Sequence, residues 1–426
     1  MEIINQIPAA MQAYLQTILA KTTNEELKKL LRNTFVNTWT TTMQITEEDA
    51  FVITGDIPAM WLRDSSAQVK NYLPLMKNSD EIRLVIGKVI ARQMASIVKD
   101  PYANAFNREA NGHGHVTDQT EMSPWVWERK YEVDSLCYAV RLAYQYYTIT
   151  GDKAIFTPTF KQAMRLILQT FTTEQRHENS PYRFTRTNCP YCDTLHNEGK
   201  GNPVAYTGMT WSGFRPSDDA CTYGYLIPSN MFAVVALKEM AHLLADGFGD
   251  QALADQALAL SDEINGGILT HGVIETEEFG KVYAYEVDGM GNVLFMDDAN
   301  VPSLISAPYL GYCQKEDEIY QNTRNMLLSK ANPYYFEGEK AKGIGSPHTP
   351  NNYVWHIALA MQGLTATSPA EQKLLLDLLL TTHADCYYMH EGVNVDNPHE
   401  FTRPWFAWAN TICSEFLITC IENGIA

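Results

Sequence analysis

The sequence has 426 residues, of which 45% are hydrophobic and 19% are charged, a composition typical of a globular protein and not of a disordered acidic chain. Its 32 Lys and Arg residues against 50 Asp and Glu residues leave a net charge of −18. A chain this acidic lacks the positive surface by which proteins bind nucleic acid or anionic lipid, so we expect neither as a partner.

The N-terminal segment Met1–Gln6 carries an acid where a secretory signal has a base, and polar residues interrupt its apolar run. No stretch approaches the ~18 consecutive apolar residues of a membrane span. The eight cysteines are scattered, and several of them fall within apolar helical patterns. Reduced, buried thiols of this kind are typical of a cytoplasmic protein, which is the location we expect.

Helical periodicity dominates the chain. The clearest case is 81–100, where Ile82, Ile86, Val89, Ile90 and Ile97 fall on one face. Similar patterns predict helices over 8–20, 26–42, 64–76, 131–149, 158–173, 229–246, 251–264, 316–329, 353–365, 369–384 and 404–423. Ser229 and Pro404 are predicted to lie at the starts of their helices.

One region, roughly 272–297, alternates in the manner of strands and turns at Asp288-Gly289-Met290-Gly291. About twelve helices joined by loops of unequal length predict an all-α fold. We expect a single domain, 1–426, in which paired helices form a toroid with a small inserted β-hairpin region. The long loops 43–63, 101–130, 176–228, 330–352 and 385–403 are uncommon in a compact domain unless they are functional.

These five loops combine Trp and Tyr with His, Asn, Asp and Gly. A sugar has an apolar face, which aromatic rings cover, and hydroxyl edges, which carboxylates, amides and Arg bind. The same residues in any one loop also suit a cap on the barrel core. Their recurrence in five loops favours a carbohydrate pocket.

Two motifs suggest other chemistry. His113, His115 and Asp118 include metal-ligand types, although imidazoles that bind hydroxyl groups are the interpretation we favour. Cys189 and Cys192 form a CxxC motif, but they lack the preceding strand of a redox motif and the second half of a zinc site. No phosphate-binding glycine loop follows a strand, so nucleotide chemistry has no support. We therefore predict no cofactor and no metal.

Glycoside hydrolysis needs one protonated and one ionised carboxyl group. Spacing alone does not choose two among 50 acidic residues. Asp218 has helpful surroundings because it adjoins Asp219 in a loop rich in aromatic and Arg residues. Glu391 lies between His390 and Gly392, where the backbone can approach a ligand closely. Without further information, a helix-capping or solvated acid is the simpler interpretation of each.

At these residues the sequence resembles glycoside hydrolase family 125, the bacterial metal-independent exo-α-1,6-mannosidases. The matching segments are GDIPAMWLRDSSAQV (55–69), WERKYEVDSLCYAVRLAY (127–144), TGMTWSGFRPSDDACTYGYLIPSNMF (207–232), FMDDANVPSLISAPYLGY (295–312), GIGSPHTPNNYVWHIALAMQGL (343–364) and MHEGVNVDNPHEFTRPWFAWAN (389–410). The resemblance implies an (α/α)6 barrel that releases terminal α-1,6-linked mannose from mannan or N-glycan fragments with inversion and without metal. It also implies that Asp218 is the general acid and that Glu391 is the general base.

Residues that hold the terminal sugar are predicted from the same loops. Arg63 and Asp64 come first, because an Arg–Asp pair offers both donors and acceptors to hydroxyl groups, although a structural ion pair at a helix start would look the same. Further candidates are Glu128, Asn300, His348 and Asn351 for hydroxyl groups, and Trp61, Trp211 and Trp405 for stacking on the ring. Each Trp is equally compatible with the core.

Two other functions remain open at this point. A sugar epimerase or isomerase on the same helical barrel would use the histidines, among them His113, His115, His348 and His390, for proton abstraction. A glycan-binding protein without activity would have the same aromatic and polar loops. In each case the expected partner is a mannose-containing or related oligosaccharide, and we expect a monomer or a weak homo-oligomer.

Overall fold

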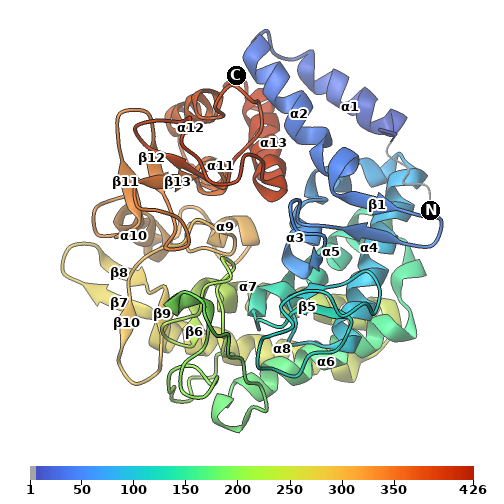
Figure 1. The fold of residues 1–426 in the computed structure, drawn as a ribbon, viewed down its shortest axis with the longest axis vertical. Coiled ribbons are helices and arrows are strands. Elements are labelled where there is room, and N and C mark those ends of the chain that lie inside the picture. The colour runs from blue at the N-terminus through green and yellow to red at the C-terminus, as the bar shows by residue number, and fades with distance from the viewer. Residues whose placement is uncertain (1–5) are drawn as a thin grey trace.

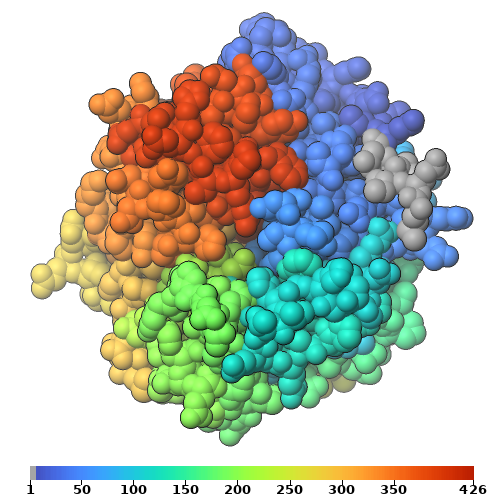
Figure 2. Space-filling view, in the orientation of Figure 1, coloured from blue at the N-terminus to red at the C-terminus, as the bar shows by residue number. Residues whose placement is uncertain are grey.

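The computed structural model describes residues 6–426 and consists mainly of helices arranged in a ring (Figure 1). The chain runs once around this ring, so that its N-terminal and C-terminal segments lie side by side (Figures 1 and 2). The expectation that the N-terminus is not a secretory signal rests on residues 1–6, and all of these except Gln6 lie outside the described residues. No helix within 6–426 has both the length and the apolar character needed to cross a bilayer.

The helices form two layers. The inner helices are α3 (Leu62–Ala67), α5 (Val133–Thr150), α7 (Ile227–His242), α9 (Ala307–Leu310), α11 (His356–Leu364) and α13 (Ala407–Glu422). The outer helices are α2 (Glu25–Thr41), α4 (Asp80–Lys99), α6 (Pro158–Glu174), α8 (Gln251–Gly267), α10 (Glu318–Leu327) and α12 (Pro369–Thr381), with α1 (Ala9–Leu19) packed outside them. Six inner and six outer helices in the described chain make an (α/α)6 barrel, which confirms the predicted fold class.

The difference between the layers follows from sequence. Outer helix α4 begins at the N-cap Ser79, whose side chain accepts a hydrogen bond from Ile82 N, and it ends with Lys99 in its last turn. Its apolar residues are buried on one face, as the periodicity predicts. Inner helices α7 and α13 are buried over almost all of their length, because they have neighbours on every side. One continuous hydrophobic cluster runs through both layers.

The ring closes where α13 packs on α2 and α3. Figure 2 shows this contact on one face, where the C-terminal segment, in red, touches the N-terminal segment, in blue. The first inner helix of the chain therefore lies next to the last one. Side chains at the starts of α3 and α13 meet although more than 300 residues separate them in sequence.

The loops contain more strands than predicted. The strands are β1 (Met43–Ile45), β2 (Ala50–Val52), β3 (Met60–Trp61), β4 (Ala105–Phe106), β5 (Val126–Glu128), β6 (Tyr225–Leu226), β7 (Val273–Thr276), β8 (Gly280–Tyr283), β9 (Glu286–Val287), β10 (Val293–Leu294), β11 (Tyr335–Glu337), β12 (Lys342–Ile344), β13 (Tyr353–Trp355) and β14 (Gly392–Asn394). They form small antiparallel sheets. The region 272–297, in which one hairpin was predicted, holds four of them, and the expectation of a single strand region was wrong. Pairs of two or three residues are too short to show an alternating pattern in sequence.

Two predicted helix starts were also wrong. Helix α7 begins at Ile227 with Pro228 in its first turn, so Ser229 is inside the helix and does not cap it. Helix α13 begins at Ala407, and Pro404 lies in the preceding loop. In both places the loop contributes to the pocket described next, and tertiary contacts set the boundary.

Candidate active site

A pocket opens at the N-terminal ends of the inner helices and has a volume of about 40 Å³. It lies at the seam of the ring, because α3 supplies one wall and the loops before α13 supply another. Its lining residues are Thr54, Ile57, Trp61, Arg63, Asp64, Pro216, Ser217, Asp218, Asn300, His348, Trp355, Glu391, Arg403, Phe406 and Trp408. Charged groups converge on it from several segments, which is typical of a functional site.

Arg63 is at the centre of the first wall. The antiparallel sheet β3–β4–β5 precedes α3 and brings Leu62 N onto Asn104 O at 3.1 Å. Arg63 Nη1 then lies 2.5 Å from Glu132 Oε2 and 3.3 Å from Asp134 Oδ2. Its other guanidinium nitrogens lie 3.6 Å from Asp64 Oδ2 and 3.5 Å from Asp218 Oδ1. One buried cation thus holds four carboxyl groups, two of which line the pocket.

Asp64 is almost fully buried beside this cation. Burial raises its pKa to about 6, against the lowering effect of Arg63. An acid with such a pKa can accept or donate hydrogen bonds near neutral pH. Asp64 is therefore suited to bind a hydroxyl group of a sugar.

Asp218 is on the second wall, in the loop before β6. Its backbone is in the left-handed region, with φ 68°, and its N–H donates to Arg215 O at 2.9 Å. Lys130 Nζ donates to Asp218 O at 2.7 Å. Burial acts to raise the pKa of Asp218, but the charges of Arg63 and Lys130 outweigh burial and hold the pKa below its ordinary value.

Glu391 is on the third wall. It directly precedes β14, which pairs antiparallel with β13 so that Gly392 is opposite Trp355. Gly392 N donates to Thr402 Oγ1 at 2.9 Å, and a Cβ on Gly392 would lie only 3.1 Å from that oxygen. The close approach fixes the backbone beside Glu391. Arg403 Nε lies 3.6 Å from Glu391 Oε1, which places a positive charge next to this carboxyl group.

His348 faces both acids from the loop between β12 and β13. Its Nδ1 lies 3.0 Å from Asp219 Oδ1, and its side chain is 35% exposed. Burial alone would lower the pKa of His348, but the hydrogen bond to Asp219 and the charges of Asp219, Glu391 and Asp218 raise it to about 9. His348 is therefore positively charged at neutral pH.

Asn300 completes the pocket wall between these loops. Its Nδ2 donates to Asp298 Oδ1 at 3.3 Å, and Ser217 Oγ donates to Asp298 Oδ2 at 2.8 Å. The buried Asp298 thus ties the loop of Asp218 to the loop of Asn300. This tie fixes the two loops relative to each other.

Aromatic rings form the floor. The ring of Phe406 makes edge-to-face contacts with Trp355 and with Trp408, with ring centroids 6.2 and 6.3 Å apart. Arg63 lies over Trp408, 5.6 Å from its ring centroid. Apolar rings below and ionisable groups above give the pocket the two kinds of surface that a sugar ring requires.

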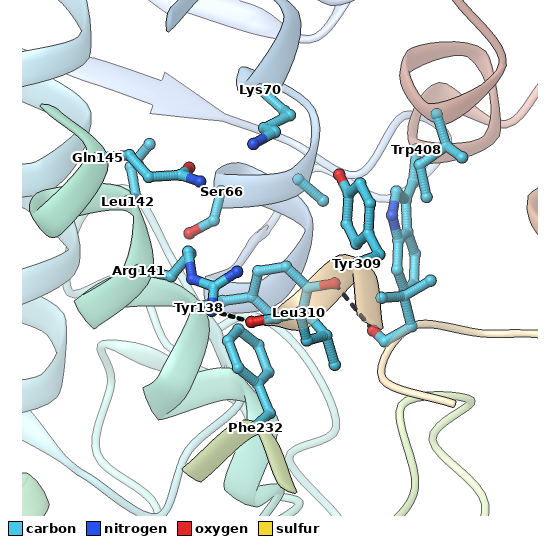
Figure 3. A pocket seen from close by; sticks show the side chains of 13 residues that line it. Ser66, Lys70, Tyr138, Arg141, Leu142, Gln145, Phe232, Tyr309, Leu310 and Trp408 are labelled. Atoms are coloured by element: carbon cyan, nitrogen blue, oxygen red, sulfur yellow. Dashed lines mark hydrogen bonds between the residues drawn. The ribbon is translucent and has the colours of Figure 1, made fainter. Parts of the chain in front are cut away.

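Trp408 also borders a second cavity further along the barrel axis (Figure 3). This cavity has a volume of about 30 Å³ and is lined by inner helices, among them α3, α5 and α13. Its charged lining residues are Lys70 and Arg141. Arg141 Nη2 donates to Leu310 O at 2.6 Å, and Arg141 Nε lies 2.9 Å from Glu239 Oε1. Carboxyl groups do not line this cavity.

The comparisons with known proteins agree with a carbohydrate site. The profile of the family described as "Metal-independent alpha-mannosidase (GH125)" matches residues 24–418. This chain belongs to glycoside hydrolase family 125. It is therefore a glycoside hydrolase and an alpha-mannosidase, as the resemblance of the sequence implied.

Relatives of the family extend this result. The chain is similar to a Streptococcus pneumoniae metal-independent alpha-mannosidase, solved as a non-productive complex with alpha-1,6-mannobiose, with 46% identity, TM-score 0.96, and coverage of 98% of this chain and 99% of that one. It is 38% identical to the meiotically up-regulated gene 157 protein of Schizosaccharomyces pombe over 97% of this chain and 86% of that protein. A bacterial glucoamylase bound to acarbose shares only the fold, with 12% identity, TM-score 0.63, and coverage of 96% and 57%.

Most of the predicted site residues meet in the family 125 pocket. Asp218, Glu391, Arg63, Asp64, Asn300, His348 and Trp61 all line it. They come from four of the five long loops, from the start of α3 and, for Asn300, from the segment between β10 and α9. The structure therefore brings together both predicted catalytic acids and the first-ranked sugar-binding pair.

Four predicted residues lie elsewhere. Trp211 is 1% exposed and stacks on His177 with centroids 3.5 Å apart, so the expectation that it binds a sugar was wrong and it belongs to the core. Trp405 packs on Gly55 and does not line the pocket. Asn351 is exposed beyond the pocket. Glu128 is buried behind it, where Arg186 Nη2 donates to Glu128 Oε1 at 2.8 Å.

Several pocket residues were not predicted. Arg403, Trp355, Phe406 and Trp408 line the pocket, and Glu132 lies directly behind Asp218. All five lie within or next to segments that carry the family resemblance. The family resemblance therefore covered these residues. Only the pairing of β13 with β14 and the closure of the ring, which the sequence does not reveal, place them at one site.

The two other motifs do not form a metal centre. Asp118 is bound by Arg186 at 2.7 and 2.8 Å, and His113 and His115 are exposed. Between residues 6 and 426, no three His, Cys, Asp or Glu side chains converge as a metal-binding group. Cys189 and Cys192 are free thiols near Asp193, which pairs with Lys130.

Proposed function

We propose that this chain is an exo-acting, inverting glycoside hydrolase that releases non-reducing terminal α-1,6-linked mannose from mannan or N-glycan fragments. The observation that carries the proposal is that Asp218 and Glu391 line one pocket from two different walls, each beside an Arg. Family membership supports the reaction class, and the mannobiose bound to the Streptococcus pneumoniae relative supports the linkage.

In this proposal Asp218 donates a proton to the glycosidic oxygen while Glu391 takes a proton from an attacking water. Inversion requires the water to enter between the base and the opposite face of the sugar ring. Arg403 places a positive charge beside Glu391. Asp218 lies beside the cations Arg63 and Lys130, and both charges oppose retention of the proton that a general acid needs.

We propose that Arg63, Asp64, Asn300 and His348 bind the hydroxyl groups of the terminal mannose. All four line the pocket, and together they offer cationic donors, an amide and a carboxyl acceptor. Trp61 and the floor rings would contact the apolar face. Because Arg63 and Trp408 lie deep in the pocket, a chain end fits better than the middle of a polysaccharide, which supports exo action.

We further propose that 1–426 act as one catalytic domain in the cytoplasm on imported oligosaccharides. The continuous hydrophobic cluster supports one domain. The eight cysteines are free thiols, which supports a reducing compartment. Size-exclusion chromatography with light scattering would test the expected monomer or weak homo-oligomer.

Incubation of the enzyme with α-1,6-mannobiose and with its α-1,2 and α-1,3 isomers, followed by NMR, tests the proposed function. We expect cleavage of the α-1,6 isomer with β-mannose as the first product. Release of α-mannose first would contradict inversion. An uncleaved but rearranged disaccharide would favour an isomerase, and tight binding without cleavage would favour a glycan-binding protein.

A further inference from the structure

Asp218 is in surroundings that oppose its proposed task. A general acid must hold a proton at the pH at which the enzyme works. Arg63 Nη2 lies 3.5 Å from Asp218 Oδ1, and Asn104 Nδ2 donates to the same oxygen at 3.4 Å. Both contacts favour the ionised carboxylate, and Lys130 adds a second positive charge. These contacts alone would leave Asp218 without a proton to give.

Glu132 lies behind Asp218 and is the group best placed to resolve this conflict. It is 1% exposed and directly precedes α5. Its carboxyl group lies beside that of Asp218, because Arg63 and Asn104 each contact both groups. Asn104 Nδ2 bridges the pair, since it lies 3.3 Å from Glu132 Oε1 and 3.4 Å from Asp218 Oδ1. Two carboxyl groups in such contact repel each other when both are ionised, so the pair retains one proton.

We propose that Glu132 is a positioning residue that holds the catalytic proton in the resting enzyme and passes it to Asp218 for transfer to the glycosidic oxygen. The inference rests on the proposed role of Asp218 as general acid. Burial raises the pKa of Glu132 well above its usual range, against the charge of Arg63, which is consistent with a protonated resting state.

The contacts of Glu132 also allow the proton to leave. Arg63 Nη1 lies 2.5 Å from Glu132 Oε2, and Ser135 Oγ donates to the same oxygen at 2.7 Å. These donors stabilise the ionised Glu132 once its proton has moved to Asp218. Since the Glu132 side chain is closed to solvent, Asp218 is its path to the pocket.

The proton balance is complete without any further reactant. Asp218 gives its proton to the glycosidic oxygen as the bond to the anomeric carbon breaks, and water forms the new bond while losing a proton to Glu391. After the products leave, Glu391 releases its proton to solvent and the Glu132–Asp218 pair takes one up. One water is consumed in each turnover.

Other charged groups also face the pair and contribute to its titration. They are Arg63 and Asp64 on α3, Glu128 on β5, Lys130 on the following loop, Asp134 on α5, His348 before β13, and Arg403 before α13. The test therefore compares variants in which these other charged groups are unchanged. It does not rely on the absolute pH at which kcat/KM falls.

The decisive variant is Glu132→Gln, because Gln copies the shape and the donor of a protonated carboxyl group but has no proton to transfer. Turnover is measured on α-1,6-mannobiose and on dinitrophenyl α-mannoside, whose leaving group needs no protonation. We expect Glu132→Gln to lose about 10²-fold or more on mannobiose and much less on the dinitrophenyl substrate. In the pH profile of kcat/KM on mannobiose, the alkaline limb, where activity falls at high pH, should move to lower pH.

Ser135→Ala gives the opposite shift. It removes a donor that stabilises the ionised Glu132, so the pair should keep its proton to higher pH and the alkaline limb should move upward. Glu239→Gln is the matched control, because Glu239 is also a carboxylate paired with an Arg, but its partner is Arg141 of the second cavity. It should leave both the substrate ratio and the limb unchanged.

Equal losses of Glu132→Gln on both substrates, with an unshifted limb, would overturn the inference. If that variant does not fold, the Ser135→Ala profile decides, and an unchanged limb contradicts the inference. Failure of the proposed function is separate: an Asp218→Asn enzyme that loses equally on both substrates would show that Asp218 is not the acid.

Discussion

Two cavities lie on the barrel axis, one on each side of Trp408, and they differ in chemistry more than in size. The two cavities are of similar size, at about 40 Å³ for the one at the N-terminal ends of the inner helices and about 30 Å³ for the other. It is lined by Asp64, Asp218 and Glu391, whereas the cavity of Figure 3 has no carboxyl lining.

The cations that line the two cavities differ in their partners. Arg141 in the second cavity is occupied by Glu239 and by a backbone carbonyl. Arg63 in the first pocket contacts four carboxyl groups, so their protonation states depend on one another. Convergent ionisable groups, and not empty volume, distinguish the site of the reaction.

The largest expected effect comes from the two acids. Glu391→Gln and Asp218→Asn should each reduce kcat on α-1,6-mannobiose by about 10²- to 10⁴-fold, because each removes one proton-transfer group. Thermal unfolding of both variants should stay close to the wild type. Near-normal turnover by the Glu391→Gln enzyme would contradict the assignment of Glu391 as the general base.

Arg63→Met tests the buried carboxyl cluster. It leaves Glu132, Asp134 and Asp64 without their cation, and we expect a loss of about 3–5 kcal/mol in unfolding free energy at neutral pH. The loss should be smaller at about pH 5 than at about pH 8, because the uncompensated carboxyl groups are then protonated. Denaturant titration at the two pH values measures this.

Arg141→Met is the control for that experiment in the second cavity. Glu239 is the carboxylate that loses its partner there, together with the carbonyl of Leu310, so the loss of stability should be smaller and the turnover should be retained. Equal effects of the two variants on turnover would show that the two cavities do not differ as described.

His348 predicts a smaller, pH-dependent effect. Its pKa is raised from 6.5 to about 9, so its ion pair with Asp219 stabilises the fold fully below about pH 6.5 and loses this contribution as pH rises through about 9. Because the side chain is 35% exposed, the contribution should be only about 1 kcal/mol or less. The difference in urea midpoint between wild type and His348→Gln should shrink from pH 6.5 to pH 9.

The smallest effect is expected at Lys70, which lines the second cavity with its Nζ 5.8 Å from the Tyr309 ring centroid. Lys70→Met should change both the unfolding free energy and the activation free energy by less than about 0.5 kcal/mol. A large fall in kcat/KM would mean that the second cavity takes part in the reaction.

The helical layers were predictable where the outer helices carry an apolar stripe and where long inner helices such as α7 and α13 carry an apolar run. The four-residue inner helix α9 was not predicted. The helix predicted over 81–100 differs from α4, Asp80–Lys99, by one residue at each end. The short strands were not predictable, because two or three residues are too few to show an alternating hydrophobic pattern. Their pairings depend on the loops that meet above the barrel.

The pocket was predictable in part for the same reason. Loop composition indicated a sugar site, and the family resemblance selected Asp218 and Glu391. Composition cannot separate Trp211 from Trp408, because both lie in aromatic, polar segments. Only packing shows that the ring of Trp211 stacks on His177 while Trp408 borders the pocket.

The closure of the ring has a consequence for synthesis. The two ends of the chain meet at α2, α3 and α13, and the pocket takes residues from both sides of that seam. A growing chain on the ribosome therefore has no working site until its last helix has emerged and docked. Turnover of mannobiose would then report the final long-range step of folding, and two fragments cut in a surface loop far from the seam would regain activity only by reassembling the whole ring.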